Sequence, residues 1–162
     1  MARLCGRAKR GKRVIGRIPW GHWKTVTFVA ALRQEGMTAP FIIDRPMNGS
    51  IFLEYVRQCL VPTLAPGDIV IMDNHAPHKL DQVRELIGTT GAQLRYLPPY
   101  SPDLNPIEPS FAQLKAHLRE AKERTIHALY DRIGDLLQLV TSAQCRNYFR
   151  KAGYGQPDGI PL

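Results

Sequence analysis

Two acidic residues occupy positions where a carboxylate could bind a metal ion, and Asp73 is the first. It ends the apolar run of residues 68–73, and Asn74 and His75 follow it. An unbroken apolar run is typical of a central strand covered on both faces, and ligands tend to bind at the carboxyl ends of such strands. A partly desolvated carboxylate there needs a cation or hydrogen-bond donors to stay ionised. A strand-end aspartate that only caps the next turn is common, and position alone favours that structural explanation.

Glu108 is the second acid, and it lies in the first turn of a long predicted helix that begins at Asn105. The helix macrodipole favours an acid there, which is by itself a sufficient structural explanation. Lys115 and Arg119 follow Glu108 at i+7 and i+11, so they lie within ~20° of it around the helix axis. This face would present an acid beside two cations, which suits a metal ion next to a phosphate backbone. An ordinary solvated face explains the same spacing equally well.

The elements that must position these acids follow from the hydrophobic periodicity. Strands are predicted at 25–32, 39–43, 68–73 and 93–97, and helices at 51–60, 80–87, 105–122, 125–140 and 142–152. Asn48 or Ser50 is a candidate cap for the first helix, and Asp103 or Asn105 for the long one. Two strands joined by a tight turn and followed by alternating helices and strands predict an α/β fold, a mixed sheet flanked by helices.

Composition indicates one folded domain. The chain has 162 residues, of which 44% are hydrophobic, enough to bury a core. No apolar run approaches the ~18 residues that cross a bilayer, and no secretory signal is visible, so we expect no membrane partner. Cys5, Cys59 and Cys145 are scattered without disulfide-framework or zinc spacing, which indicates a reducing, cytoplasmic setting.

The net charge of +8 is concentrated at the N-terminus, since residues 1–34 contain nine Lys or Arg and no acid. Outside that segment 13 basic and 14 acidic side chains nearly balance. A concentrated basic segment suits a polyphosphate partner, because each neutralised phosphate releases counterions. A solvated basic tail, or a misassigned start codon, explains the charge equally well, so charge does not decide between them.

The segment 97–115, LPPYSPDLNPIEPSFAQLK, separates these interpretations. It closely resembles the hallmark of DDE-type bacterial insertion-sequence transposases related to the mariner superfamily, in which a PPYSPDLNPIE run carries the last catalytic acid, here Glu108. The strand that ends in Asp73 resembles the one with the family's middle acid, and the thirty-four residues between the two acids match the family's interval. Residues 19–32 and 148–154 also resemble family sequence, so the similarity covers nearly the whole chain.

The resemblance implies an RNase H-like fold in which three carboxylates hold two Mg²⁺ (or Mn²⁺) ions for DNA strand cleavage and strand transfer. Asp73 and Glu108 are then two of the three catalytic, metal-binding acids. Hard oxygen ligands of this kind suit these ions. Asn74, His75 and Asn105 are expected to support the acids. The implied DNA-binding residues are Arg10, Lys12, Arg13, Lys24, Lys115 and Arg119.

The third acid is expected on the first strand of the fold, but residues 1–34 contain no Asp or Glu. The resemblance therefore implies that this acid lies upstream of Met1, as does the helix-turn-helix region that reads the element's ends. We expect a basic segment at 1–24, a partial catalytic domain at 25–154 without its first strand, and a tail at 155–162. Either a decayed fragment or the downstream frame of a frameshifted element explains this. The expected partners are transposon-end DNA, target DNA and a second copy of the chain, and a segment encoded by the upstream frame is a further candidate. We expect the chain to act in the bacterial nucleoid.

The remaining candidate residues have simpler structural roles. Asp44 could substitute for the missing acid, but its spacing does not match, and an Asp before a Pro turn needs no catalytic explanation. His75 and His78 lack two further ligands for zinc. Trp20, His22 and Trp23 could stack on bases but are more simply packing residues.

Two other classes of function compete with a catalytic fragment. One is a non-catalytic DNA-binding or dimerisation module in which the basic segment contacts phosphates. The other is a metal-dependent nuclease of another RNase H-like family, and the SPDLNPIE segment argues against it.

Overall fold

The computed structural model describes residues 7–13, 15, 25–123 and 125–155. The strands are β1 (Thr27–Leu32), β2 (Met37–Ile43), β3 (Ile69–Met72) and β4 (Gln93–Tyr96), and the helices are α1 (Gly49–Tyr55), α2 (Asp81–Gly88), α3 (Ile107–Ala121), α4 (Ile126–Gln138) and α5 (Ser142–Lys151). Each strand and helix predicted from the sequence is present, with its ends shifted by a few residues. Trp20, His22, Trp23 and Lys24, for which the sequence predicted packing or DNA-binding roles, lie outside the described residues. Most of the segment 1–24 and residues 156–162 also lie outside them.

β1 and β2 form an antiparallel hairpin, with Thr27 opposite Ile43 and Leu32 opposite Met37. The register shifts between Val29 and Ala31, and Ala39 on the facing strand has a φ of 50°. An irregularity of this kind locally increases the twist of a strand pair. The hairpin is therefore twisted, and its two faces contact different layers of helices.

β3 and β4 form a parallel pair joined through α2, with Ile69 opposite Gln93 and Met72 opposite Tyr96. Parallel neighbours need a crossover connection, and α2 supplies it. Val83 and Ile87 of α2 are fully buried against this pair. The parallel arrangement brings the ends of β3 and β4 together, where Leu97 N donates a hydrogen bond to Met72 O at 2.8 Å.

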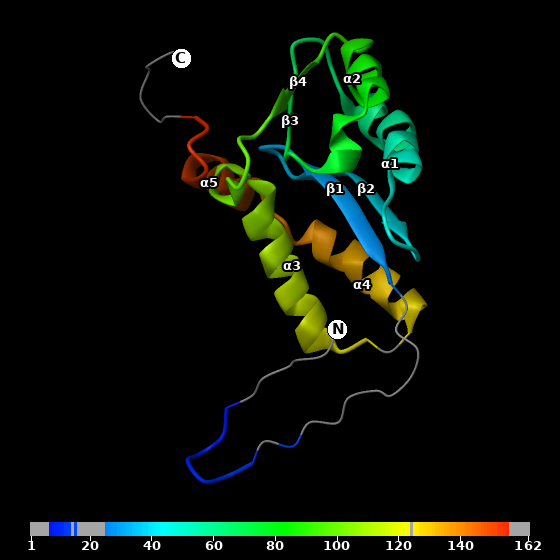
Figure 1. The fold of residues 1–162 in the computed structure, drawn as a ribbon. Helices are drawn as coiled ribbons and strands as arrows, with labels where there is room; N and C mark the ends of the chain where they lie inside the picture. Colours follow the sequence, from blue (N-terminus) through cyan, green and yellow to red (C-terminus); the bar gives the residue numbers. More distant parts are fainter. Residues whose placement is uncertain (1–6, 14, 16–24, 124, 156–162) are drawn as a thin grey trace.

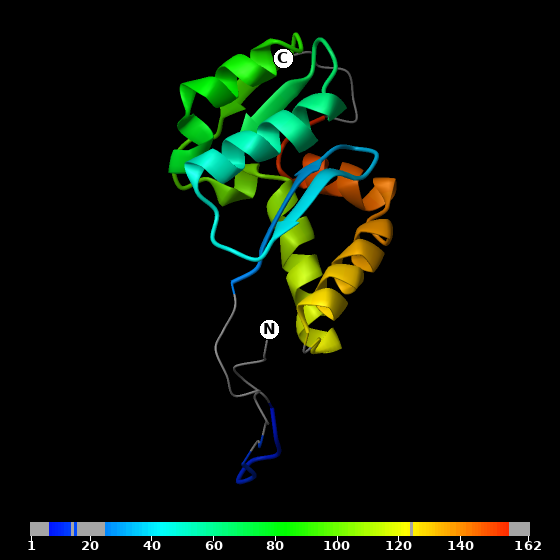
Figure 2. The same ribbon diagram turned by 90° about the vertical axis from the view of Figure 1, so that its right-hand side faces the viewer.

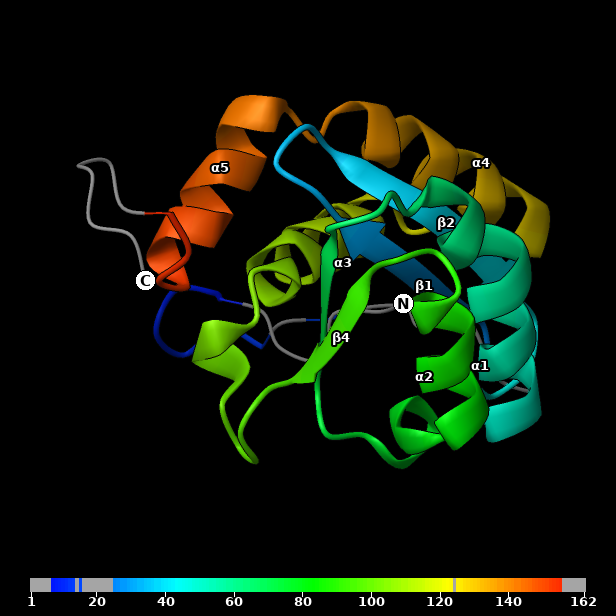
Figure 3. The ribbon, with the colours of Figure 1, turned by 90° about the horizontal axis from the view of Figure 1, so that it is seen from above.

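Helices cover the strands from two sides (Figures 1 and 2). On one side α1 and α2 bury a cluster that includes Phe52, Tyr55, Val56, Val83 and Ile87. On the other, Leu114 and Leu118 of α3 pack against Ile133 and Leu136 of α4, and Phe28 and Ile42 of the hairpin contact this second cluster. Seen from above, the strands lie between α1 and α2 on one side and α3, α4 and α5 on the other (Figure 3). The predicted α/β layering is confirmed.

Caps explain where several helices begin. The side chain of Asn48 accepts a hydrogen bond from Ile51 N at 2.9 Å, so the first of the two predicted caps of α1 is the one used. α1 continues through a π-helical turn at Val56–Leu60. Thr125 caps α4, and Thr141 forms a capping box with Gln144 at the start of α5. Within the described residues, no helix is long and apolar enough to cross a membrane.

The four strands form two separate ribbons, β1–β2 and β3–β4, rather than one continuous sheet. The antiparallel and parallel pairings of the predicted mixed sheet are both present, but no described strand joins them. The run 68–73 was predicted to be covered on both faces, and this is wrong at its start, because Ile69 is 62% exposed. The reason is that helices α1 and α2 cover one face, whereas the edge of β3 away from β4 has no neighbouring strand among the described residues.

Candidate active site

Asp73 and Glu108 reach the same space from different elements. Asp73 directly follows β3, and Glu108 lies in the first turn of α3. Both residues line a cavity of about 530 Å³ between the two ribbons, and both also line a second cavity of about 470 Å³. Asn105 borders the same two cavities. The structure therefore brings the two predicted catalytic acids and one predicted supporting residue to a common opening.

The proline-rich segment before α3 fixes where Glu108 stands. Pro106 is buried and precedes the first helical residue, and Asn105 Oδ1 accepts a hydrogen bond from Ile107 N at 3.4 Å. Glu108 N donates to Asn105 O at 3.2 Å. Asp103, the alternative cap, lies in a preceding 3₁₀ turn, Pro102–Leu104. Proline has one preferred φ, so the approach to the helix is stiff and the exposed Glu108 side chain starts from a defined backbone position.

Asp73 is held by the loop that follows it. Its Oδ1 accepts a hydrogen bond from His75 N at 3.0 Å and lies 2.6 Å from His78 Nδ1. The second contact lacks the angles of a hydrogen bond, and it is an ion pair only when His78 is protonated. The His78 ring also packs on Phe52, with 4.4 Å between ring centroids. Asp73 is thus both a turn cap, as its position suggested, and half-exposed towards the cavity.

Of the other two predicted supporting residues, Asn74 acts through its side chain and His75 through its main chain. Asn74 Nδ2 donates a hydrogen bond to Leu97 O, which ties the loop after β3 to the start of the proline-rich segment. His75 contacts Asp73 through its main-chain N–H, and its side chain is exposed. Asn74 therefore holds together the two chain segments that carry the acids, whereas the exposed imidazole of His75 lies beside the ring of His78, with 5.8 Å between ring centroids.

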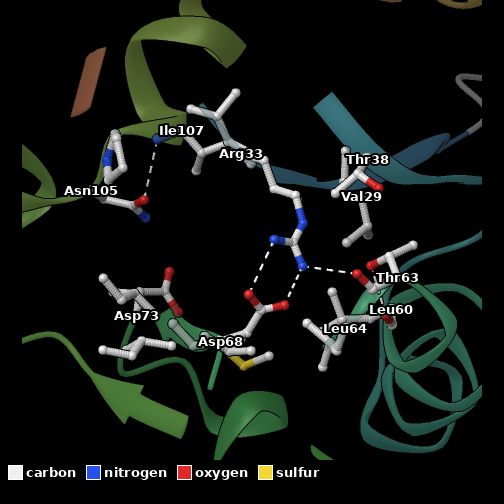
Figure 4. A pocket seen from close by; sticks show the side chains of 18 of the residues that line it. Val29, Arg33, Thr38, Leu60, Thr63, Leu64, Asp68, Asp73, Asn105 and Ile107 are labelled. Carbon is white, nitrogen blue, oxygen red and sulfur yellow. Dashed lines mark hydrogen bonds and ion pairs between the residues drawn. The ribbon is translucent and has the colours of Figure 1, made fainter. Parts of the chain in front are cut away.

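An ion pair closes the opposite end of the larger cavity (Figure 4). The Arg33 guanidinium donates to both carboxylate oxygens of Asp68 and, at 2.8 Å, to Thr63 O. The hydrogen bond from Arg33, helped by the N–H of Ala65, holds the pKa of Asp68 below its usual range, and the same bond raises the pKa of Arg33. In Figure 4 the carboxylate of Asp73 points into the cavity from the side that also carries Asn105.

The predicted DNA-binding residues fall into two groups. Arg10, Lys12 and Arg13 are exposed, and so are Lys115 and Arg119 on α3, on the helix that carries the exposed Glu108. Lys24 lies outside the described residues. Asp44, the alternative to the missing acid, follows β2 and does not line either cavity.

The donor set suits a hard divalent ion but is incomplete. Asp73 and Glu108 offer carboxylate oxygens, the ligands that Mg²⁺ and Mn²⁺ prefer. No group of three or more His, Cys, Asp or Glu within the described residues is arranged to hold a metal ion. These two carboxylates offer two oxygen ligands of the kind that such an ion prefers.

Two residues near the acids were not predicted to act there. His78 was considered only as a zinc ligand, although it contacts Asp73. Tyr100 lines the second cavity, is fully exposed and has a left-handed φ of 57°, a backbone region that non-glycine residues seldom occupy. The position of Tyr100 in the Pro-Pro-Tyr-Ser run could have indicated this exposure, because an aromatic residue between a proline pair and a turn has few packing partners.

Solved structures of a mariner transposase resemble this fold. The Mos1 strand transfer complex and the Mos1 paired-end complex with left transposon end match with TM-scores of 0.73 and 0.72, each at 16% identity over 93% of this chain and 47% of theirs. The catalytic domain of Mos1 mariner transposase matches with a TM-score of 0.65 at 15% identity, over 80% of this chain and 74% of that one. The chain thus spans about half the length of the first two relatives, and the RNase H-like fold predicted from the sequence is confirmed.

No curated protein has a sequence that matches the chain. The sequence of residues 1–130, however, matches the family described as DDE superfamily endonuclease. That range includes both acids, the proline-rich segment and all four strands. The chain therefore belongs to the DDE superfamily of endonucleases.

Proposed function

We propose that this chain is part of a transposase catalytic domain that cleaves DNA strands and transfers them during the movement of an insertion sequence. Asp73 and Glu108 are two of its three metal-binding acids, and the third comes from outside the described residues. The proposal rests on one observation. Two acids from separate elements, β3 and α3, border the same two cavities in a chain of the DDE endonuclease family.

The arrangement supports phosphodiester chemistry in three ways. The two carboxylates offer hard oxygen ligands at one end of the larger cavity, and divalent ions bound there would activate a water or DNA 3′-hydroxyl and stabilise the leaving oxygen. Asn74 and the backbone of Asn105 hold the loop and helix that carry the acids. The exposed Lys115 and Arg119 continue the face of α3 that begins with Glu108, where a DNA backbone would lie.

Metal binding tests the two acids directly. The isolated chain is expected to bind Mn²⁺ weakly, because two carboxylates provide only part of a coordination sphere. Asp73→Asn and Glu108→Gln should each weaken this binding about 10-fold, since each change replaces an anionic ligand with a neutral one. Electron paramagnetic resonance titration of free Mn²⁺ measures the affinity.

Glu85→Gln is the matched control, because Glu85 is an exposed acid on α2 that lines neither cavity. It should leave the Mn²⁺ affinity unchanged. Equal decreases in affinity in all three variants would indicate general charge attraction, and the assignment of Asp73 and Glu108 as ligands would be wrong.

The affinity for DNA is expected to depend steeply on salt. Removal of one phosphate-binding side chain should reduce the slope of log K against log salt by about 0.9. We expect Lys115→Gln and Arg119→Gln to flatten the slope, and deletion of residues 1–13 to flatten it further. Fluorescence anisotropy with duplex DNA over a range of NaCl concentrations measures this.

An unchanged slope after the deletion would exclude the N-terminal segment from DNA binding. If DNA binding depends on that segment while Mn²⁺ binding is absent, the chain is instead a non-catalytic DNA-binding module.

A further inference from the structure

Tyr100 is an open aromatic side chain beside the two acids. Its relative exposure is 102%, and its side chain makes no hydrogen bond or ring contact with the described residues. It lines the second cavity, of about 470 Å³, which Asp73 and Glu108 also line. A single exposed aromatic residue needs no special explanation by itself, so the meaning of this one depends on its backbone and its neighbours.

The backbone holds Tyr100 in a conformation that a bulky residue rarely adopts. Its φ of 57° lies in the left-handed region, which glycine occupies without steric cost. The chain is stiff on both sides, because Ser101 Oγ donates a hydrogen bond to Pro99 O at 3.3 Å and Pro102 begins a 3₁₀ turn. The tyrosine side chain therefore contributes no packing, and glycine would suit this backbone better. Residues in such conformations cluster at sites that bind ligands.

A cation lines the same cavity as Tyr100. The segments after β3 and β4 leave this parallel pair at the same end (Figure 3), so the turn Ala76–Lys79 and the segment of Tyr100 both border the second cavity. Lys79 is exposed and has no ion-pair partner among the described residues. The hydrogen bond from Asn74 to Leu97 O ties the two segments together. An aromatic ring, an ammonium group and two carboxylates thus border one space.

These groups match the parts of a single nucleotide. A base stacks on an exposed aromatic ring whatever its sequence, and sites for single-stranded nucleic acid combine such rings with cations that bind the backbone. The cavity, at about 470 Å³, lies within the range of ~300–1,000 Å³ that is usual for ligand pockets. The faces of a base inside a duplex are covered by its stacked neighbours, so only a base taken out of the stack can lie on this ring.

We propose that the second cavity is a nucleotide subsite, in which Tyr100 stacks on the base of an unpaired nucleotide and Lys79 binds its phosphate. The subsite lies beside the reacting phosphodiester, and this part of the inference rests on the proposed function, because Asp73 and Glu108 border the cavity. The stacking itself needs neither a metal ion nor cleavage. Tyr100 therefore makes the chain prefer DNA that is unpaired next to the reaction point, a preference that contacts with phosphates alone do not give.

A nucleotide fits these surroundings better than a protein partner. The buried centre of a protein–protein interface is depleted of charged residues. Tyr100 instead shares its cavity with Lys79 and the carboxylates of Asp73 and Glu108. A nucleotide carries both a flat apolar base and a charged phosphate, so it can use the ring and the cation together.

The test uses the full chain, a chelator, and two dye-labelled probes of equal length, a thymidine oligonucleotide and a strand in which every nucleotide is abasic. Fluorescence anisotropy measures the affinities. Tyr100→Ala should weaken binding of the oligonucleotide about 10-fold, the contribution of one stacked base, and leave that of the abasic strand unchanged. Tyr100→Phe keeps the ring and should bind both probes like the unchanged chain. Equal weakening for both probes, or no weakening in Tyr100→Ala, would overturn the stacking.

Two further variants separate stacking from a role in the fold. Leu104→Ala is the matched control, because Leu104 is an exposed apolar residue of the same segment that lines neither cavity, and it should change neither affinity. Tyr100→Gly should bind the oligonucleotide as weakly as Tyr100→Ala without lowering the midpoint of thermal unfolding, because glycine suits a φ of 57°. A fall in the unfolding midpoint that accompanies the loss of binding would make Tyr100 a structural residue and contradict the proposal.

Base pairing and self-association give two more outcomes. When the oligonucleotide is paired with its complement, Tyr100→Ala should bind it as tightly as the unchanged chain does. An equal loss of affinity for the duplex would mean that Tyr100 contacts the backbone and not an unpaired base. If Tyr100→Ala changes the oligomeric state of the chain but not its affinity for the oligonucleotide, the ring is a protein contact, and the subsite is wrong.

The salt dependence of binding tests Lys79. Lys79→Gln should reduce the slope of log K against log salt for the oligonucleotide by about 0.7, the value for one phosphate contact on a single strand. Arg57→Gln is the control, because Arg57 is an exposed cation that lines neither cavity, and it should leave the slope unchanged. An unchanged slope in Lys79→Gln would overturn its assignment to the phosphate.

The subsite and the proposed function fail separately. Mn²⁺ binding that depends on Asp73 and Glu108, without any difference between the two probes, would overturn the subsite and leave the proposed function in place. A preference for the oligonucleotide that depends on Tyr100, without Mn²⁺ binding, supports the subsite and removes the metal chemistry from it.

Discussion

Asp73→Asn and Glu108→Gln are each expected to lower DNA cleavage by the completed domain, in which the proposed third acid is supplied together with this chain, by on the order of 10³-fold. The two side chains border the same cavities, and each substitution removes one negative charge while keeping the shape of the side chain. Two acids that act on one reaction centre should not contribute additively, so the double variant should lose little more than either single variant. Single-turnover cleavage of DNA that carries an element end, with Mn²⁺ present, measures the rates.

The chain alone is expected not to cleave that DNA, because in the proposed function the third carboxylate comes from outside the described residues. In the completed domain, the Glu85→Gln variant should cleave DNA at the same rate as the chain without substitutions. A chelator should abolish the cleavage activity of both. Robust cleavage by the chain alone, abolished in both variants, would show that two acids suffice and that the third is not needed. Cleavage that both variants retain would remove Asp73 and Glu108 from the reaction.

The positions of the two acids were predictable because each depends on local sequence. The apolar run before Asp73 and the helical stripe that follows Glu108 defined a strand end and a helix start without knowledge of their neighbours. The spacing within one helix likewise placed Lys115 and Arg119 on the face of Glu108, and both are exposed. That the two acids share a cavity was expected only through the family resemblance, since no local pattern relates β3 to α3.

The contacts that the sequence did not reveal join residues far apart in the chain, or join them through an irregular turn. Arg33 and Asp68 are thirty-five positions apart, and nothing in either local pattern pairs them. His78 reaches Asp73 because the 3₁₀ turn at Ala76–Lys79 folds it back. The split sheet was also not predicted, because alternation of apolar residues shows which faces of a strand are covered but not which edges are paired.

A large decrease in stability is expected for Ile87→Ala. Ile87 is fully buried in the cluster between α2 and the strands, so its truncation should lower the free energy of unfolding by about 2–5 kcal/mol. That is a large part of the 5–15 kcal/mol, roughly, that stabilises a domain. Ile69→Ala is the matched control, because Ile69 is apolar but 62% exposed, and it should cost about 0.5 kcal/mol. Urea unfolding followed by circular dichroism measures both.

The same pair of variants tests whether the edge of β3 is open in solution. If Ile69→Ala costs as much as Ile87→Ala in the chain alone, Ile69 is already covered and the edge is not available. Since Asp73 directly follows β3, the state of this edge also determines how open the surroundings of that acid are.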